Sequence, residues 1–441
     1  KKIEVKDLNL SSINSLPYLT QKFYTKSILK SSSTQSLINT LPAINLKTYG
    51  GRAGISTISI HGGQSQRFLV LLDGISLNNE QNGGTDISQI PKFILSNIEY
   101  VNQGHTSRFG QSAMTGLLSL NSSTHSTSML ISAGNFNQWS TNMQLSKDLD
   151  KSKFTFSIGI DNYNANYSYI EKGRYSLVPY QINQEFDSLK NAIKQIFLYS
   201  NYKHTFSSNS NFKISYLNVY NSREISTHIY NSDNIEKIFD GLQLINFRAK
   251  LRNHEILFSN RRINIDYLQY QHKLNKVQFI YTFLWNEFNM KGKLVNISNI
   301  STNAIDTSKT ILNYSASYKQ KFKNLILSLS AMVEKEKSRN LSWGCDGILK
   351  YNFNQFFNTS FTISKNFKKP NFNDLFWEPF GDPNLKTEES LNYYLKNNII
   401  NKNFAIIIDL HYIKFNHLIN WRPMVGNSAY WIPENISYAK S

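Results

Sequence analysis

Apolar and polar residues alternate strictly along much of the chain. Five segments show the pattern most clearly: Phe154–Asp161, Val277–Asn286, Leu325–Val333, Phe357–Ser364 and Phe404–Tyr412. In the first segment, four apolar residues occupy one set of alternate positions, and polar or small residues occupy the other. A period of two residues is that of a β-strand, whose successive side chains point to opposite faces. We therefore predict many β-strands, each with one apolar face.

The alternating segments approach the ~9–11 residues that a tilted strand needs to cross a bilayer, whereas strands of soluble sandwiches usually have ~5–6 residues. Polar, Asn- and Ser-rich connectors of unequal length separate them, such as Tyr163–Asn191 and Asn296–Lys309. Unequal connectors suit a membrane barrel with short turns at one end and long loops at the other. At ~10 residues per strand plus loops, we count about 14 strands.

Composition leaves two classes of protein open. The mean hydropathy of −0.40 and the hydrophobic fraction of 40% are typical of a soluble protein, yet aromatic residues make up 13% of the chain. In a membrane barrel only alternate residues face lipid, and aromatic residues gather at the two interfaces. A large soluble β-protein with an aromatic core fits the composition equally well. A transmembrane helix is excluded because no run of ~18 apolar residues occurs.

The chain before residues 119–128 has a different character, with dense glycines and short apolar runs. We predict short strands at Ile58–Ile60, Phe68–Leu72, Ile98–Val101 and Leu117–Leu120. Glycine turns separate these strands, so this part is a small α/β unit. No arrangement of nucleophile, base and orienting acid is present in it.

Two local signals sharpen this prediction. The pair Asp73-Gly74 is a strong tight-turn signal, because glycine tolerates positive φ. Pro91 is suited to open a short helix that ends before Ile98.

Charge and cysteine content add little. The net charge of +18 is compatible with anionic partners such as nucleic acid, lipopolysaccharide phosphates or an acidic ligand. The lysines are scattered without a clustered stripe, and the chain is rich in Lys, Asn and Ile together, which favours nucleotide bias as the origin of the charge.

The single cysteine, Cys345, excludes an intrachain disulfide and a cysteine-based metal cluster. The chain opens Lys1-Lys2-Ile3-Glu4 without a signal-peptide core, so an export signal would be removed or lie outside this sequence.

Five motifs in order between residues 36 and 122 resemble the plug domain of TonB-dependent outer-membrane transporters. They are His61-Gly62, Leu69–Leu77, Asp86–Pro91, Ile98–Gly104 and Phe109–Leu120. Each is weak alone, but five at family-like spacing are specific. The residues that carry the plug signature are Gly62, Asp73, Gly74, Asp86, Pro91, Glu99, Gly104, Gly110 and Gly116.

A second resemblance to this family lies late in the chain. The segments Phe367–Trp377 and Gly381–Glu389 look like a loop motif of the family's barrel, in which aromatic residues anchor a loop and Gly381-Asp382-Pro383 turns the chain into the next strand. Residues 421–423 and 430–437 also look like a strand pair of cobalamin-receptor-like members. The barrel-motif residues are Pro370, Leu375, Trp377, Gly381, Pro383, Leu385 and Glu388.

The resemblance implies a transmembrane antiparallel β-barrel, 22-stranded in the family and incomplete here, with a small α/β plug domain in its lumen. We expect residues 1–122 to form the plug, with a core at 36–122, and residues 123–441 to form a barrel truncated at its C-terminus. The chain ends Ala439-Lys440-Ser441 without the aromatic residue of family barrels. Ile3 and Val5 are too little to identify a TonB-contacting box.

One position departs from the family pattern. His61 stands where the family usually carries arginine. A histidine can form an ion pair only when it is protonated, and its pKa is near neutrality. We therefore expect no fixed ion pair at this position.

The family's function implies active uptake of a scarce, bulky nutrient across the Gram-negative outer membrane. The plug apex, which we define as residues 49–57 and 78–85, would bind ligand together with extracellular loops, and the TonB–ExbB–ExbD complex would pull on the plug. Outer-membrane lipid and lipopolysaccharide are further implied partners, and nucleic acid is not. The candidate ligand contacts, which could instead satisfy loop backbone groups, are Tyr49, Arg52, Ile55, Ser56, Asn79, Gln81, Asn82 and Thr85.

Cobalamin or a related corrinoid is the preferred ligand, because residues 41–50 and 55–62 look most like cobalamin-receptor-like members from Bacteroidota. A ferric siderophore is the alternative within the fold. Haem is disfavoured because His61 and His105 lie on or near plug strands and the other histidines are scattered. A passive porin or adhesin would not retain five plug motifs. An enzyme should show a catalytic cluster, and we expect no catalytic residue, metal ligand or cofactor.

Overall fold

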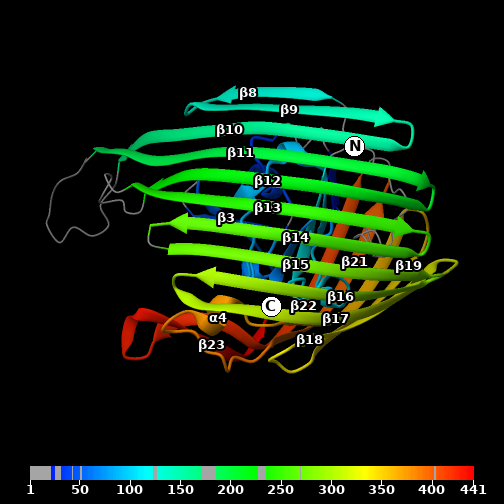
Figure 1. Cartoon of the computed structure of the whole chain (residues 1–441). Helices are drawn as coiled ribbons and strands as arrows, with labels where there is room; N and C mark the ends of the chain where they lie inside the picture. Colours follow the sequence, from blue (N-terminus) through cyan, green and yellow to red (C-terminus); the bar gives the residue numbers. More distant parts are fainter. Residues whose placement is uncertain are drawn as a thin grey trace.

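One large antiparallel sheet curves around a smaller sheet, as Figure 1 shows. The structure is a computed structural model that describes residues 21–24, 31–41, 43–49, 52–122, 127–170, 185–226, 235–268, 270–401 and 404–441. Ile3 and Val5 lie outside the described residues. We call the large sheet the wall and the smaller unit inside it the plug.

The wall has 16 strands, and each pairs with the strand that precedes or follows it in the chain. They are β8 (Ser128–Gly134), β9 (Gln138–Leu149), β10 (Ser152–Ile170), β11 (Glu185–Ser207), β12 (Ser210–Ser226), β13 (Ile235–Leu251), β14 (His254–Tyr267), β15 (Tyr270–Trp285), β16 (Phe288–Ser301), β17 (Ala304–Phe322), β18 (Leu325–Glu336), β19 (Ser342–Asn352), β20 (Phe357–Lys368), β21 (Glu388–Ile400), β22 (Ala405–Met424) and β23 (Asn427–Lys440). Among the described strands, β8 and β23 are the two edges of the sheet, and no ladder joins them.

The apolar face of the wall points outward, and the polar face points toward the plug. On β10, Phe154 and Ile158 are 43% and 44% exposed, whereas Thr155 and Ser157 are fully buried. A soluble protein would bury the apolar set, so this orientation is that of a barrel whose outer face meets lipid. The predicted alternation on β15 and β18 has the same sense, with Phe279 and Leu329 exposed.

The two rims of the wall differ in the length of their connections. Five connections on one rim, which we call the short-turn rim, have two residues each: 150–151, 208–209, 252–253, 286–287 and 323–324. On the opposite rim, which we call the loop rim, residues 369–387 join β20 to β21 and contain the helix α4 (Phe372–Phe376). Unequal connections are therefore confirmed, and in such barrels the longer ones face the cell exterior.

Three sequence predictions about the wall differ from the structure. The wall has 16 strands, rather than the count of about 14 made from strand and loop lengths. The segment Asn296–Lys309 is a tight hairpin between β16 and β17, not a long connector. Here the apolar residues Val295 and Ile297 are buried against the plug and the polar residue Asn296 is exposed, which is the opposite of the arrangement on β10. The strand is therefore hard to recognise from its sequence. The predicted connector Tyr163–Asn191 is strand up to Ile170 and again from Glu185.

The plug is built on a five-stranded sheet with the order β1-β6-β7-β4-β5. Its elements are β1 (Gln21–Tyr24), α2 (Thr34–Ile38), β2 (Ile44–Tyr49), β3 (Ile55–Ile60), η2 (Ser65–Arg67), β4 (Phe68–Leu72), β5 (Ile75–Ser76), η3 (Ile87–Gln89), η4 (Lys92–Ile94), β6 (Leu95–Val101), α3 (Thr106–Phe109) and β7 (Gly116–Ser122). Strands β2 and β3 form a separate hairpin. All four strands predicted for this unit are present.

The predicted turn and helix start of the plug are also confirmed. Asp73 and Gly74 connect β4 to β5 with φ of 50° and 83°, so both residues lie in the left-handed region. Pro91 is the residue that precedes the short helix η4. The central strands pack through Phe68, Val70 and Leu118, which are buried.

Candidate functional site

The plug apex and the wall strands β13 and β14 enclose a cavity of about 250 Å³ near the loop rim. It gathers four sequence-predicted contact residues: Ile55, Asn79, Asn82 and Thr85. The hydroxyl of Thr85 is buried and has no hydrogen-bond partner among the described residues. Ligand sites usually measure ~300–1,000 Å³, so this cavity suits one substituent of a large molecule. The wall contributes Arg223, Ile238, Asp240, Ile263 and Ile265.

Part of the apex loop is held by its own polar side chains. The Asn79 side chain accepts a hydrogen bond from the Gln81 backbone N–H at 2.9 Å, and Asn82 accepts one from Gly84 at 3.0 Å. The Gln81 side chain is buried and donates to the hydroxyls of Tyr270 and Ser301 on the wall. These residues shape the loop and attach it to the wall.

The other three apex candidates lie outside this cavity. Tyr49 is 60% exposed at the end of β2. Ser56 is buried, and its hydroxyl accepts a hydrogen bond from the Gln35 side chain at 3.2 Å. Arg52 forms an ion pair with Asp161 on β10 at 3.1 Å and lies over the Tyr163 ring.

A buried arginine of the wall joins the apex to two strands. Arg223 on β12 is 1% exposed, and its guanidinium lies 2.9 Å from Asp86 of the plug and 2.6 Å from Asp240 on β13. It also donates to the Ser88 hydroxyl at 2.7 Å. Asp86 in addition caps η3 and accepts from the Ser56 backbone N–H. One cation therefore lies between two carboxylates and reduces the repulsion between them.

On the other side of the plug, Arg67 forms a bidentate pair with Glu388 at the start of β21. Both distances between guanidinium nitrogens and carboxylate oxygens are 2.8 Å, and Arg67 also donates to the Ile419 carbonyl at 2.9 Å. The two side chains are 4% and 0% exposed. Bidentate pairs of this kind are geometrically specific as well as strong.

A third buried cluster surrounds Asp346 on β19. Arg108 lies 2.6 Å from the Asp346 carboxylate, and Ser107 donates to it at 2.5 Å. His105 contacts the same carboxylate at 3.4 Å. Burial lowers the pKa of His105, and the nearby Asp346 only partly opposes this effect. The neutral imidazole is therefore the favoured form, and Arg108 supplies the balancing charge.

Two carboxylates of the plug face cations of the wall. Asp73 lies 3.0 Å from Lys213, and Glu80 contacts both Arg261 and Lys276. Burial alone would raise the pKa of each carboxyl group. The neighbouring cations outweigh burial and lower both pKa values below their usual range, so both groups stay ionised. Ion pairs thus hold the plug to the wall along its circumference.

His61 makes a different contact. Its Nε2 lies 2.9 Å from the Asn102 carbonyl, and its ring centroid is 3.9 Å from that of His411 on β22. Burial lowers the pKa of His61, which favours the neutral ring. Among the described residues no side-chain ion pair of His61 is present.

The glycines of the plug signature occupy tight positions. A Cβ at Gly104 would collide with the Met114 carbonyl, and one at Gly116 would lie 2.8 Å from the Val101 carbonyl. Gly62 and Gly110 have φ of 67° and 114°. Glu99 is buried on β6.

The barrel-motif loop closes over the plug apex. The Phe372 and Asn373 backbone N–H groups donate to the carbonyls of Glu80 and Gln81 at 3.0 and 2.8 Å. Asn371 caps α4 and donates to Gln66 of the plug at 3.0 Å. These bonds tie the loop at residues 369–387 directly to the apex.

The remaining motif residues give this loop its shape. Leu375 and Leu385 pack on Ile419, and Trp377 forms an isolated bridge with Ala304 at the start of β17. A Cβ at Gly381 would collide with the backbone at Leu375. The Pro370 and Pro383 carbonyls accept from Lys309 and Arg339.

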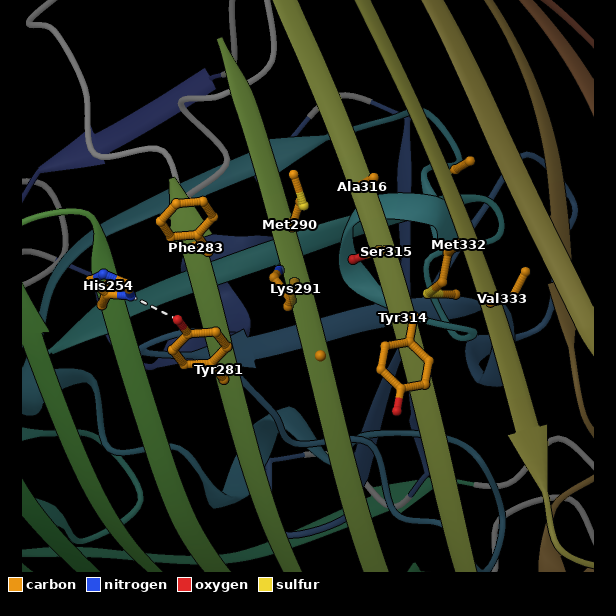
Figure 2. Close-up of a pocket in the computed structure, with 12 residues that line it drawn as sticks. His254, Tyr281, Phe283, Met290, Lys291, Tyr314, Ser315, Ala316, Met332 and Val333 are labelled. Atoms are coloured by element: carbon orange, nitrogen blue, oxygen red, sulfur yellow. Dashed lines mark hydrogen bonds between the residues drawn. The ribbon is translucent and has the colours of Figure 1, made fainter. Parts of the chain in front are cut away.

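A further hollow lies elsewhere, on the outer face of the wall. It measures about 770 Å³, and Tyr281, Phe283, Met290, Tyr314 and Val333 surround it, as Figure 2 shows. Its surface is almost entirely apolar. Because it faces lipid, we do not assign it to nutrient binding.

Sequence reasoning missed most wall residues that hold the plug, namely Lys213, Arg223, Asp240, Arg261 and Asp346. Glu388 was found through the resemblance, and Arg108 directly precedes the plug motif Phe109–Leu120, but the partners of these two residues were not identified. A polar or charged residue at an inward-facing strand position is a signal for such partners. Within the described residues, no group of three or more His, Cys, Asp and Glu side chains could hold a metal ion. No helix in the described residues is long and apolar enough to span a membrane.

A wall with an apolar outer face that encloses an ion-paired plug defines the class of plugged outer-membrane receptors. The model of the TonB-dependent receptor plug domain matches residues 12–117. The vitamin B12 transporter BtuB of Vibrio vulnificus (strain YJ016) is 24% identical, over 93% of this chain and 69% of the transporter. Residues 12–117 therefore match the plug domain of TonB-dependent receptors, and the two findings together support a TonB-dependent receptor of the outer membrane.

Solved structures show the same fold. The siderophore receptor PirA of Acinetobacter baumannii superposes with a TM-score of 0.75 at 11% identity, over 96% of this chain and 76% of that one. The FrpB iron transporter of Neisseria meningitidis gives a TM-score of 0.73 at 10% identity, over 94% and 74%. These relatives are receptors and transporters rather than enzymes, and receptors of this class work with the TonB complex and bind small molecules.

Proposed function

We propose that this receptor actively imports a corrinoid, with cobalamin as the preferred cargo. The observation that carries the proposal is the similarity to a vitamin B12 transporter over 93% of the chain. The similarity spans both the plug and the wall, and is not limited to the plug motifs.

We propose that the plug apex makes the first contact with this cargo. Ile55 and Asn82 are exposed, and together with Asn79 and the unpartnered Thr85 hydroxyl they line the apex cavity. Tyr49 is exposed beside them, whereas Ser56 and Gln81 are buried and support the loop. Arg52 would contact cargo only if it left Asp161.

Transport requires the plug to move, since it fills the space inside the wall. We propose that the TonB–ExbB–ExbD complex supplies the force, and that the ion pairs of Arg67, Arg108 and Arg223 break and re-form in each cycle. We further propose that the plug comprises residues 1–122 with its core at 36–122, and the barrel residues 123–441. The apolar outer face would contact outer-membrane lipid and lipopolysaccharide, and we expect no nucleic-acid partner.

A ferric siderophore is the second candidate cargo, because the solved structures with this fold include siderophore receptors. A passive porin or adhesin is a weaker alternative, because a plug anchored by several buried ion pairs would obstruct free diffusion.

The experiment is equilibrium binding of cyanocobalamin and of several ferric siderophores to the refolded full chain. We expect cyanocobalamin to bind and Thr85→Val to weaken its binding, with the exposed Thr141→Val on β9 as the matched control. Binding of a ferric siderophore instead would reassign the cargo, and binding of neither class would refute both proposals.

A further inference from the structure

A second cavity of about 150 Å³ lies inside the wall, between β4 and β5 of the plug and the wall strands β15 to β18. Six lysines line it: Lys276, Lys291, Lys293, Lys309, Lys368 and Lys369. Arg108 adds a seventh positive charge, and among the described lining residues three carboxylates oppose them. We call this space the lysine cavity.

The three carboxylates already have partners. Glu80 contacts Lys276 and also Arg261. Glu334 and Glu336 lie 3.2 and 3.9 Å from the Lys369 ammonium, and Glu336 lies 3.9 Å from Lys309. Arg108 is paired with Asp346 outside the cavity.

Three of the six lysines have no carboxylate partner in the cavity: Lys368, which donates to the Lys369 carbonyl at 3.3 Å, and Lys291 and Lys293 of β16. Lys293 has no ion pair or hydrogen bond among the described residues, and Lys291 reaches only the Arg108 carbonyl at 3.5 Å. Both side chains point inward from alternate positions of the same strand, and the register places Lys293 opposite Asn313 rather than an acid. Asn313 is a neutral amide, and it donates to the Glu334 carboxylate at 3.2 Å.

Excess positive charge between low-dielectric surfaces attracts anions. Water screens such charges poorly when protein surrounds them on both sides, and clefts of one sign concentrate counter-ions. Ammonium groups also form charge-assisted hydrogen bonds with carboxylate and phosphate oxygens. An oxyanion would supply the partner that Lys293 and Lys291 lack.

The cavity also extends in the direction of transport. At one end it reaches Pro370 and Asn371 of the loop that covers the apex, and at the other it reaches Gly74 and Arg108. Gly74 follows Asp73, whose partner Lys213 lies near the short-turn rim. The lysines are thus distributed between the binding side and the opposite rim.

We propose that the lysine cavity binds an oxyanion of the imported nutrient, a phosphate or a carboxylate, and that the nutrient passes the plug along β15–β17. This inference rests on the proposed import function but assigns a separate site. It makes Lys293 a specificity-determining residue for anionic cargo.

The test uses the purified full chain in detergent and inorganic phosphate as the probe, with chloride keeping the ionic strength constant. We expect Lys293→Gln to weaken phosphate binding about 10-fold or more, as for loss of one charge-assisted hydrogen bond in a shielded site. Lys293→Arg should retain most of the affinity. Lys147→Gln, at an exposed position of β9, should leave it unchanged.

A second arm separates this site from the proposed cargo. Cyanocobalamin carries a phosphodiester, and cobinamide lacks it, so Lys293→Gln should weaken binding of the first more than of the second. If phosphate binding depends on Lys293 but no corrinoid binds, the lysine cavity stands and the proposed cargo fails. If corrinoid binds and phosphate affinity is equal in wild type and Lys293→Gln, the lysine cavity is refuted and the import function stands. Should Lys293→Gln fail to fold, Lys291→Gln takes its place under the same criteria.

Discussion

The Glu388→Gln substitution tests how strongly the plug is held in the wall. Glu388 accepts two hydrogen bonds from Arg67 and one from the Ile419 backbone N–H, at 2.8, 2.8 and 2.9 Å. Its side chain is fully buried, and that of Arg67 is 4% exposed. Glutamine keeps the size of the side chain but leaves the Arg67 guanidinium buried without its counter-ion.

The cost follows from this burial. Removing one partner of a buried ion pair destabilises a protein by about 3–5 kcal/mol. Each ~1.4 kcal/mol changes an equilibrium constant tenfold. The fraction of molecules in which the plug is locally open at β4 should therefore rise roughly 100- to 4,000-fold.

Hydrogen–deuterium exchange of the β4 amides measures this opening directly. Phe68–Leu72 directly follow Arg67 and pair with β7, so these amides exchange only when the segment opens. The matched control is Glu434→Gln, because Glu434 pairs with Arg422 at an exposed site with side-chain exposures of 34% and 57%. Exposed pairs contribute about 0–1 kcal/mol. Equal exchange of β4 in the two variants would refute the reasoning that the Arg67–Glu388 pair holds the plug.

Three further predictions concern His61 and Gly104 of the plug and Arg223 of the wall. Burial lowers the pKa of His61 from its usual 6.5. As the pH falls below 6.5, the unfolded chain therefore binds the proton first, and the free energy of unfolding decreases by no more than ~1.4 kcal/mol per pH unit. Between pH 7.5 and 5.5, the thermal stability of His61→Gln should decrease less than that of the wild type. Gly104→Ala drives a Cβ into the Met114 carbonyl and should cost about 1–3 kcal/mol or more in urea unfolding, whereas Gly241→Ala, with 3.5 Å to its nearest neighbour, should be nearly neutral. Arg223→Met leaves Asp86 and Asp240 facing each other and should lower the free energy of unfolding by about 3–5 kcal/mol. Adding Asp240→Asn should recover part of this stability. If it recovers none, charge repulsion is not the cause of the loss.

The sequence predicted those features that depend on residues close together in the chain. The alternation at Phe154–Asp161 correctly indicates a strand, and the turn at Asp73-Gly74 depends on two adjacent residues. The partnership of Arg67 and Glu388, which are 321 residues apart, depends on how the plug seats in the wall. The segment Asn296–Lys309, which holds the end of β16 and the start of β17, was mistaken for a connector because Val295 and Ile297 face the plug and reverse the expected polarity.

The basic residues show most clearly what the linear sequence hides. Along the chain the lysines form no clustered stripe, which favours a compositional origin for the net charge of +18. In the wall, however, the register brings both Lys276 and Lys309 opposite Ile297, from strands on either side of β16. Glutamine at Lys293 or at Lys147 lowers the net charge by the same amount, so the two variants differ only in where the charge is lost. A phosphate affinity that fell equally in both would assign the attraction to bulk charge, whereas a loss confined to Lys293→Gln would assign it to the lysine cavity.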